Sequence, residues 1–233
     1  MNIEALKQEF WKEGYLHLES FFTEDLMDNL NDIILKHFGM NPNWEHSAEF
    51  IKTSGAEIVP WFPQREGVKE FDLISDHASL QEITSAILGE EWGELYSMSM
   101  FSKKGTIGQA WHQDCPPEDS NKFNLNRLVY THDIDASIGG QVKLVPGTHK
   151  KGELPAGDPF STMDGEITLA PKKGDLVLLH GHCWHSVSPV VGTYRVSTNY
   201  RAMPKGTPEE ITDICVYRNM RYQFSSSEVL VTR

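Results

Sequence analysis

Residues 174–187 read GDLVLLHGHCWHSV, and this stretch decides the fold. A turn ends at Gly174, an apolar run follows, and three histidines close the segment. Short apolar or alternating runs between turn residues are typical of strands in all-β sandwiches and barrels. The same texture fills the second half of the chain and predicts eight strands, at 95–102, 109–114, 127–132, 141–145, 167–169, 175–180, 183–187 and 195–200.

The first 94 residues predict helices instead. Apolar residues recur at helical spacing in residues 3–13 and stop at Gly14, and residues 15–19 alternate as a short strand. Thr23 is a typical N-cap for a second helix, and residues 80–88 predict a third. Residues 41–69 are rich in aromatic residues and proline without a period, which predicts a long loop or lid.

Length and pattern together predict one domain over residues 1–233. We expect a helical face and lid region at 1–94, a strand core at 95–201 and a C-terminal extension at 202–233. Helices that precede a series of strands favour a mainly β fold with N-terminal helices packed on one sheet.

Composition narrows the partners and the location. The net charge is −12 and no basic stripe is visible, so we expect no nucleic-acid partner. No apolar run approaches the roughly 18 residues of a membrane span, and the N-terminus has no signal-peptide pattern. Three cysteines without framework spacing indicate reduced thiols in a cytoplasm. The expected partner is a small-molecule substrate, and the expected state is a monomer or homodimer.

A metal site is predicted by His112-Gln113-Asp114. Side chains two apart on a strand share a face, so His112 and Asp114 can point to one centre. A single His-x-Asp sequence is common by chance. A second histidine from a distant strand would complete a face of two histidines and one carboxylate, which leaves positions open and suits non-haem Fe(II) and oxygen chemistry.

Three histidines compete to be that distal ligand: His180, His182 and His185. Strand alternation places His185 on one face and the other two on the opposite face. For His180 and His182 the plainer interpretation is a packed or surface histidine. A structural zinc site is a further alternative, although the chain offers no second cysteine pair to close it.

Arg195 and Ser197 follow the last histidine. If the turn centred on Val190 joins two antiparallel strands, both residues share the face of His185. A guanidinium beside a hydroxyl can hold a carboxylate, and a dicarboxylate cosubstrate would supply one. A surface salt bridge is the commoner fate of a strand arginine. Arg127 and Arg201 are similar cases, either binding an acidic substrate or pairing with acids.

Four blocks between residues 8 and 201 resemble the phytanoyl-CoA dioxygenase family of Fe(II)- and 2-oxoglutarate-dependent oxygenases. The opening block is FWKEGYL at 10–16 with FFTEDL at 21–26, and the first metal motif is WHQD at 111–114. A turn block, GQVKLVPGTHK, lies at 140–150. The distal histidine segment is KGDLVLLH at 173–180 followed by HSVSP at 185–189. The order and spacing of the blocks make the resemblance specific.

The resemblance implies a double-stranded β-helix, the jelly-roll of cupin-like proteins, with helices packed on one sheet. It implies that His112, Asp114 and His185 are the catalytic iron ligands. Arg195 would pair with the distal carboxylate of 2-oxoglutarate, helped by Ser197.

Strand hydroxyls are further candidates for cosubstrate binding. Ser99 lies on the expected strand at 95–102, before the metal motif, and Thr131 lies on the expected strand at 127–132. Either hydroxyl could contact 2-oxoglutarate, although strand hydroxyls are often only packed.

The implied activity is that of an oxidoreductase with Fe(II) as cofactor and 2-oxoglutarate and O2 as cosubstrates. It hydroxylates an unactivated C–H bond of a small molecule in biosynthesis or catabolism, while 2-oxoglutarate is decarboxylated to succinate. The carboxylate at Asp114 favours oxygenation, because halogenating relatives lack it. The same chemistry giving desaturation, cyclisation or demethylation is one alternative. A protein hydroxylase or a non-catalytic jelly-roll binding module is another.

Overall fold

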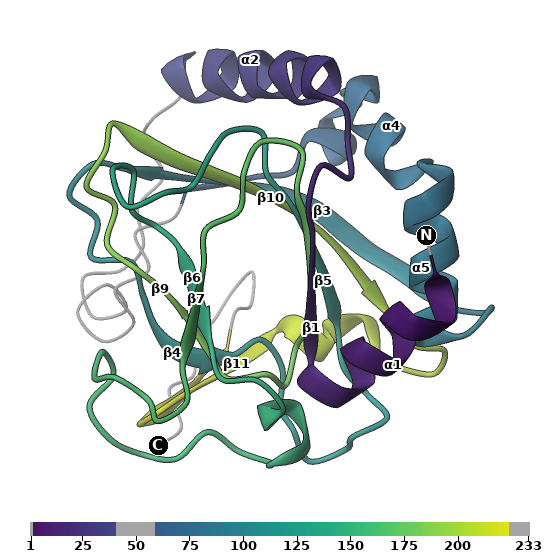
Figure 1. Ribbon diagram of the computed structural model, residues 1–233, viewed down its shortest axis with the longest axis vertical. Coiled ribbons are helices and arrows are strands. Elements are labelled where there is room, and N and C mark those ends of the chain that lie inside the picture. The colour runs from purple at the N-terminus through teal and green to yellow at the C-terminus, as the bar shows by residue number, and fades with distance from the viewer. Residues whose placement is uncertain (1, 41–58, 224–233) are drawn as a thin grey trace.

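The computed structural model describes residues 2–40 and 59–223 as two antiparallel sheets that face each other, with helices on one side (Figure 1). The predicted mainly β fold with a jelly-roll core is confirmed. Most connections pass from one sheet to the other, so strands adjacent in sequence are often not neighbours in a sheet.

The first sheet, called sheet A here, has six strands. Four of them form the middle of the sheet, and a short strand closes each edge. In spatial order they are β1 (Tyr15–Leu18), β8 (Leu176–His180), β5 (Leu125–Val129), β10 (Tyr194–Met203), β3 (Gly93–Lys103) and β2 (Val59–Trp61).

The second sheet, sheet B, also has six strands. In spatial order they are β12 (Met220–Gln223), β11 (Ile214–Tyr217), β4 (Gln109–Gln113), β9 (His185–Val187), β6 (Val142–Leu144) and β7 (Ile167–Leu169). A hydrophobic cluster fills the space between the two sheets. It includes Met100 and Leu128 from sheet A, Tyr130 directly after β5, and Leu144 from sheet B.

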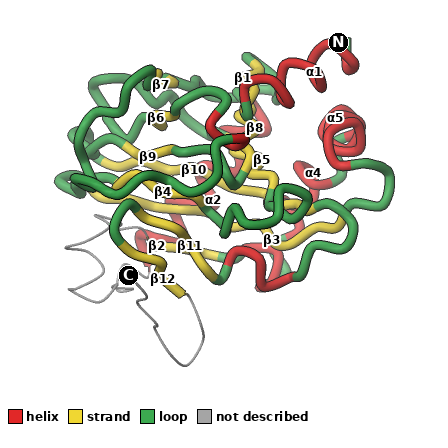
Figure 2. Tube along the Cα trace, turned by 90° about the horizontal axis from the view of Figure 1, so that it is seen from below, coloured by secondary structure: helices red, strands yellow, loops and turns green. Residues whose placement is uncertain are grey.

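The helices cover the outer face of sheet A. They are α1 (Ile3–Glu13), α2 (Glu24–Met40), α4 (Asp72–Ser75) and α5 (Ala78–Leu88), with short 3-10 turns η1 (Pro63–Glu66), η2 (Lys69–Phe71), η3 (Thr148–Lys150) and η4 (Glu209–Thr212). In Figure 2, α1, α4 and α5 gather beside β1, β8 and β5, away from β6 and β7. Apolar residues of these helices form one core with the outward residues of β5, β8 and β10.

Local sequence explains where α1 begins and ends. The Asn2 side chain accepts a hydrogen bond from the Ala5 amide, which caps the first turn. Gly14 ends the helix in the left-handed conformation, with φ of 81°. A Cβ at Gly14 would also meet the His149 ring, so this glycine lets α1 pack against the η3 turn.

The structure corrects two expectations about strand connectivity. β9 and β10 do not form a hairpin, because β9 pairs with β4 and β6 in sheet B while β10 pairs with β3 and β5 in sheet A. The region expected as a C-terminal extension contributes β11 and β12, and β11 extends sheet B beside β4. Burying the free edge of β4 explains why these strands join the core.

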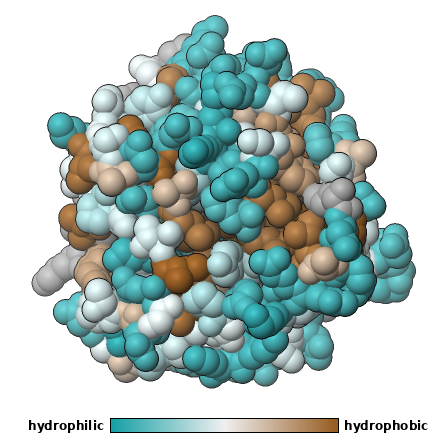
Figure 3. All heavy atoms as spheres, viewed as in Figure 1, coloured by the Kyte–Doolittle hydropathy of each residue, from teal (hydrophilic) through white to brown (hydrophobic). Residues whose placement is uncertain are grey.

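Residues 41–58 of the expected lid lie outside the described residues. No helix among the described residues is long and apolar enough to cross a membrane. On the face shown in Figure 3, hydrophobic residues lie in patches between hydrophilic ones.

Candidate functional site

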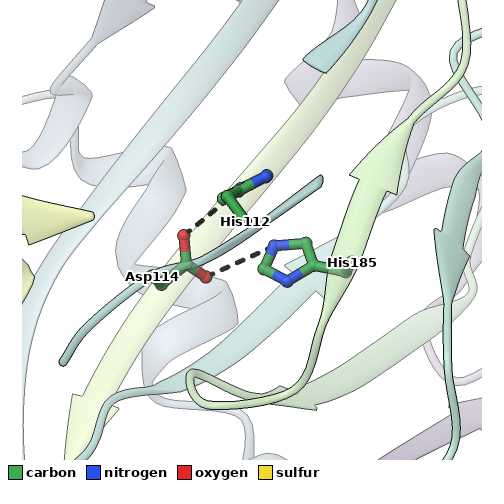
Figure 4. Close-up of side chains that lie close together, drawn as sticks. All are labelled: His112, Asp114 and His185. Atoms are coloured by element: carbon green, nitrogen blue, oxygen red, sulfur yellow. Dashed lines mark ion pairs between the residues drawn. The ribbon is translucent and has the colours of Figure 1, made fainter. Parts of the chain in front are cut away.

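His112, Asp114 and His185 come together between the two sheets (Figure 4). Their possible ligand atoms all lie within 4.8 Å of one another, and all three side chains are buried. His112 Nε2 lies 3.8 Å from Asp114 Oδ1, and His185 Nε2 lies 3.6 Å from Asp114 Oδ2. This is the only such group of histidine, cysteine and carboxylate side chains within residues 2–40 and 59–223.

Backbone pairing places the two histidines. His112 on β4 is opposite His185 on β9, so their side chains share the inner face of sheet B. Asp114 follows β4 by one residue, and its amide donates to the Gly181 carbonyl oxygen. The His112 ring also stacks on Tyr217 of β11, with ring centroids 5.3 Å apart.

Backbone carbonyl groups orient both imidazoles. His112 Nδ1 lies 2.8 Å from the Ala110 oxygen, and His185 Nδ1 lies 2.9 Å from the Cys183 oxygen. A carbonyl only accepts, so each Nδ1 must carry the proton and each Nε2 keeps its lone pair. That is the arrangement in which a histidine binds a metal through Nε2.

The carboxylate of Asp114 is held from both sides. Arg201 Nη2 donates to Oδ1 over 3.1 Å, and Asn126 Nδ2 donates to Oδ2 over 2.6 Å. Arg201 Nε also donates to Asn126 Oδ1, so the two partners of the carboxylate brace each other. Arg201 Nη1 donates to the Tyr96 hydroxyl over 2.6 Å. We call Arg201 and Asn126 the carboxylate clamp.

The protonation states of Asp114 and His112 favour binding of a cation by the triad. Burial raises the pKa of Asp114, but the charge of Arg201 and the nearby histidines outweigh burial and lower the pKa to about 2. Burial, and then the neighbouring His185, lowers the pKa of His112 to about 3. The site therefore presents one carboxylate and neutral imidazole at neutral pH.

Arg195 lies on β10, in the sheet that faces the triad. Its side chain is 2% exposed, and Nε donates to the Gly140 oxygen over 2.8 Å. No carboxylate of the described residues pairs with this guanidinium, and the Tyr130 hydroxyl is the group that attracts its charge. A Cβ at Gly140 would collide with the Arg195 side chain, so the glycine makes room for it.

Ser197 is the next inward residue of β10. It is fully buried, and its hydroxyl has no hydrogen-bond partner. The Tyr130 hydroxyl is also buried, and it interacts with the Arg195 guanidinium. Arg195 and Ser197 thus leave a buried cation without a carboxylate and a hydroxyl without a partner for a ligand to satisfy.

Ser99 and Thr131 lie elsewhere. Ser99 pairs with Thr198 across β3 and β10, and their hydroxyls lie 3.2 Å apart. Thr198 shares the face of Val196, which packs under the helices, so Ser99 points away from the triad. Thr131 donates to Asn31 of α2 over 2.9 Å. The structure does not bring either hydroxyl to the triad.

His180 and His182, the other two histidines of residues 174–187, form a separate group with His149. His149, His180 and His182 lie together under α1, and we call them the histidine stack. The His180 ring lies 5.0 Å from each of the other two and 3.8 Å from the parallel ring of Phe123. The chain turns at residues 181–184 between β8 and β9, which separates His180 from His185.

Arg201 was expected either to bind an acidic substrate or to pair with acids, and it pairs with Asp114. Asn126 was not expected at the site, although the sequence carries a signal for both residues of the clamp. Polar residues alternate along β10 on the face of Arg195 and Ser197, and Arg201 is the last of them. Asn126 lies at an inward position of β5, a strand that is otherwise largely apolar. A polar side chain at an interior strand position needs a buried partner, and here the partner is Asp114.

The donor set fits a divalent transition metal. Two imidazoles and one carboxylate, each oriented by a second group, form the face typical of non-haem iron sites. The unpaired Arg195 fits the carboxylate of an organic acid.

Comparison with known proteins agrees with this geometry. A family model described as phytanoyl-CoA dioxygenase matches residues 10–193. No curated protein matches the chain.

Solved structures share the fold. The non-heme alpha-ketoglutarate-dependent epimerase SnoN from nogalamycin biosynthesis is 16% identical, covers 93% of this chain and 85% of its own, and has a TM-score of 0.67. HygX from Streptomyces hygroscopicus, with nickel and 2-oxoglutarate bound, is 16% identical over 90% of this chain and 89% of its own, with a TM-score of 0.70. The carbocyclase SnoK is 13% identical over 92% and 86%, with a TM-score of 0.68.

Proposed function

The chain belongs to the phytanoyl-CoA dioxygenase family, and on that premise we propose that it is an Fe(II)- and 2-oxoglutarate-dependent oxygenase that acts on a small molecule. The proposed iron ligands are His112, Asp114 and His185. We propose that Arg195, with Ser197 and Tyr130, holds the distal carboxylate of 2-oxoglutarate.

One observation carries this proposal: a buried guanidinium without a carboxylate partner lies across the barrel from a buried two-histidine, one-carboxylate group. A guanidinium is costly to bury when no carboxylate balances its charge, and Arg195 is buried in that state. A dicarboxylate removes that cost when it binds. Bound iron would supply the activation of oxygen.

The residues of the chain supply position. The Ala110 and Cys183 carbonyl groups fix the imidazole tautomers, and the carboxylate clamp fixes Asp114. Apolar residues such as Leu144 and Val177 fill the space between the sheets around these groups. Fixed ligands and an apolar surrounding would confine oxidation to the substrate.

The product is proposed to be an alcohol. The names of the similar structures include an epimerase and a carbocyclase. Product mass separates the outcomes, because hydroxylation adds one oxygen atom, desaturation or ring closure removes two hydrogen atoms, and epimerisation leaves the mass unchanged. A protein hydroxylase is a second candidate that the same assay would test with peptide substrates.

An anaerobic titration tests the cofactor pair. Fe(II) is added to the apo protein, then 2-oxoglutarate, while the weak visible charge-transfer band of the chelate is followed. We expect the band in the wild type and its loss in Arg195→Ala at the same cosubstrate concentration, with Fe(II) affinity unchanged. Absence of the band in the wild type, together with tight zinc binding, would contradict the proposal.

A further inference from the structure

We propose that a polar cavity at the β3 side of sheet A, linked to the metal centre through Arg201, binds a compact oxyanion group of the substrate, a carboxylate or a phosphate ester. This inference rests on the proposed function and names a substrate class for it. The cavity has a volume of about 300 Å³. Its lining includes Arg65, Glu94, Tyr96, Ser97, Arg127 and Arg201.

The cavity lies at a free stretch of β3. β2 pairs with β3 only at Ser99–Phe101, so within the described residues Glu94–Ser97 have no strand on that side. Tyr96 points inward and binds Arg201, which binds the metal-site carboxylate of Asp114. Ser97 points to the helix side. The lining of the cavity therefore takes side chains from both faces of sheet A, and Arg201 connects it to the triad.

Arg65 is a cation available at the rim. Its guanidinium lies 4.7 Å from the centre of the Phe62 ring and 5.5 Å from that of Tyr96. The guanidinium has no hydrogen bond or ion pair to another described residue. The aromatic faces hold the side chain in place, and its donors are not used by any other residue in 2–40 or 59–223.

Arg127 is a cation at the floor. It is 1% exposed, and its Nε donates to the Tyr200 oxygen over 2.7 Å. Its other donors make long contacts, 3.4 Å to Thr84 and 3.2 Å to Glu94. The Glu94 side chain is 46% exposed, so its carboxylate can swing into water when another anion arrives.

Ser97 supplies a neutral donor. It is 5% exposed, and its Oγ has no hydrogen-bond partner. A buried hydroxyl without a partner destabilises the fold, and a bound oxyanion would satisfy it.

The charges favour an anion over a cation or an apolar group. Three guanidinium groups line the cavity against the one carboxylate of Glu94, in a chain whose net charge is −12. Arg201 is committed to Asp114, and Arg127 is paired with the half-exposed Glu94. Arg65 is therefore the cation that can take the ligand directly, and Arg127 becomes available when Glu94 moves into water. A guanidinium pair with a nearby hydroxyl matches the geometry of carboxylate and phosphate oxygens.

Sulfate is the probe for the cavity. It is titrated calorimetrically at constant ionic strength into Arg195→Gln, which removes the other unpaired buried cation. We expect saturable binding that weakens about tenfold when Arg65→Gln is added and about threefold with Ser97→Ala. Lys103→Gln, an exposed cation at the other end of β3, is the matched control and should change nothing. No sulfate binding, or equal binding in Arg65→Gln, would overturn the proposal.

A turnover experiment identifies the source of the anion. Oxygen consumption by the Fe(II)- and 2-oxoglutarate-loaded protein is measured with candidate acids and their methyl esters. We expect only the acids to stimulate consumption, and Arg65→Gln to lower kcat/KM for them about tenfold. Stimulation by esters alone would assign the cavity to a separate anion and overturn the substrate assignment. The chelate band of Arg65→Gln should match the wild type, so failure here and failure of the cofactor assignment remain distinct.

Discussion

Two groups of buried histidines lie in the same barrel and differ in their hydrogen bonds. In the triad, Nδ1 of His112 and of His185 faces a backbone carbonyl, and a carboxylate lies beside both rings. In the histidine stack, His180 Nδ1 accepts the His182 amide over 3.1 Å. That nitrogen must be unprotonated, so neutral His180 carries its proton on Nε2.

Burial alone therefore does not make a histidine a metal ligand. In the stack, the His180 ring packs face to face with Phe123 and edge-on against Trp11, so it is held by ring contacts. Rings of the triad are held so that their lone pairs converge beside a charged oxygen. The proposed chemistry depends on that second condition.

Removing the carboxylate should have the largest effect. Asp114→Ala takes away a ligand and leaves Arg201 buried without its partner. We expect Fe(II) affinity to fall at least about a hundredfold, and stability to fall by about 3–5 kcal/mol. Isothermal titration with Fe(II) under argon and urea unfolding measure the two effects. Unchanged metal affinity would remove the distinction between the triad and the stack.

Removing Arg195 should weaken cosubstrate binding and spare the metal. We expect Arg195→Gln to weaken 2-oxoglutarate by about 30- to 100-fold, since it deletes a bidentate charge-assisted contact. Stability should rise or stay level, because an unpaired buried charge disappears. Equal 2-oxoglutarate affinity in the variant would place the dicarboxylate elsewhere.

Loosening the clamp should have an intermediate effect. Arg201→Gln removes a charge-assisted bond to Asp114, and we expect Fe(II) affinity to fall about tenfold. Arg201→Lys should recover part of this loss, because it keeps the charge but not the fork that reaches both Asp114 and Tyr96. Equal Fe(II) affinity in Arg201→Gln and Arg201→Lys would assign the effect to packing.

Acid should weaken the fold through the stack. Burial lowers the pKa of His180 well below its ordinary value of 6.5. The unfolded chain takes up a proton there as the pH falls below about 6.5 while the folded chain does not, so the free energy of unfolding decreases. We expect His180 to contribute about 1 kcal/mol of this loss between about pH 7.5 and about pH 5.5. Urea unfolding of the apo protein at both pH values measures the loss, and His180→Phe should show a shallower dependence.

Much of the fold followed from local pattern. The helix at Ile3–Glu13 and the strand at Ile167–Leu169 have the expected bounds, since caps, turns and alternation act within a few residues. The pairing of β9 and β10 with different sheets could not be read from the turn between them. That choice depends on long-range packing between the sheets.

The site residues also fall into those that local spacing predicts and those that depend on long-range packing. The local spacing of His112 and Asp114 and the alternation of Arg195 and Ser197 were readable from the chain. The face assignment of His185 was reached on the premise of one continuous strand, whereas a turn at residues 181–184 separates it from His180. Asn126 and Ser99 show the limit, because nothing local tells which face of a buried strand meets the triad.

A matched pair of variants tests the central distinction most directly. Fe(II) is titrated anaerobically into His185→Ala and His180→Ala, each compared with the wild type. We predict that His180→Ala, although destabilised by about 2–4 kcal/mol, binds one Fe(II) per chain with the wild-type affinity, whereas His185→Ala does not bind it. Loss of the metal in His180→Ala with retention in His185→Ala would contradict the account.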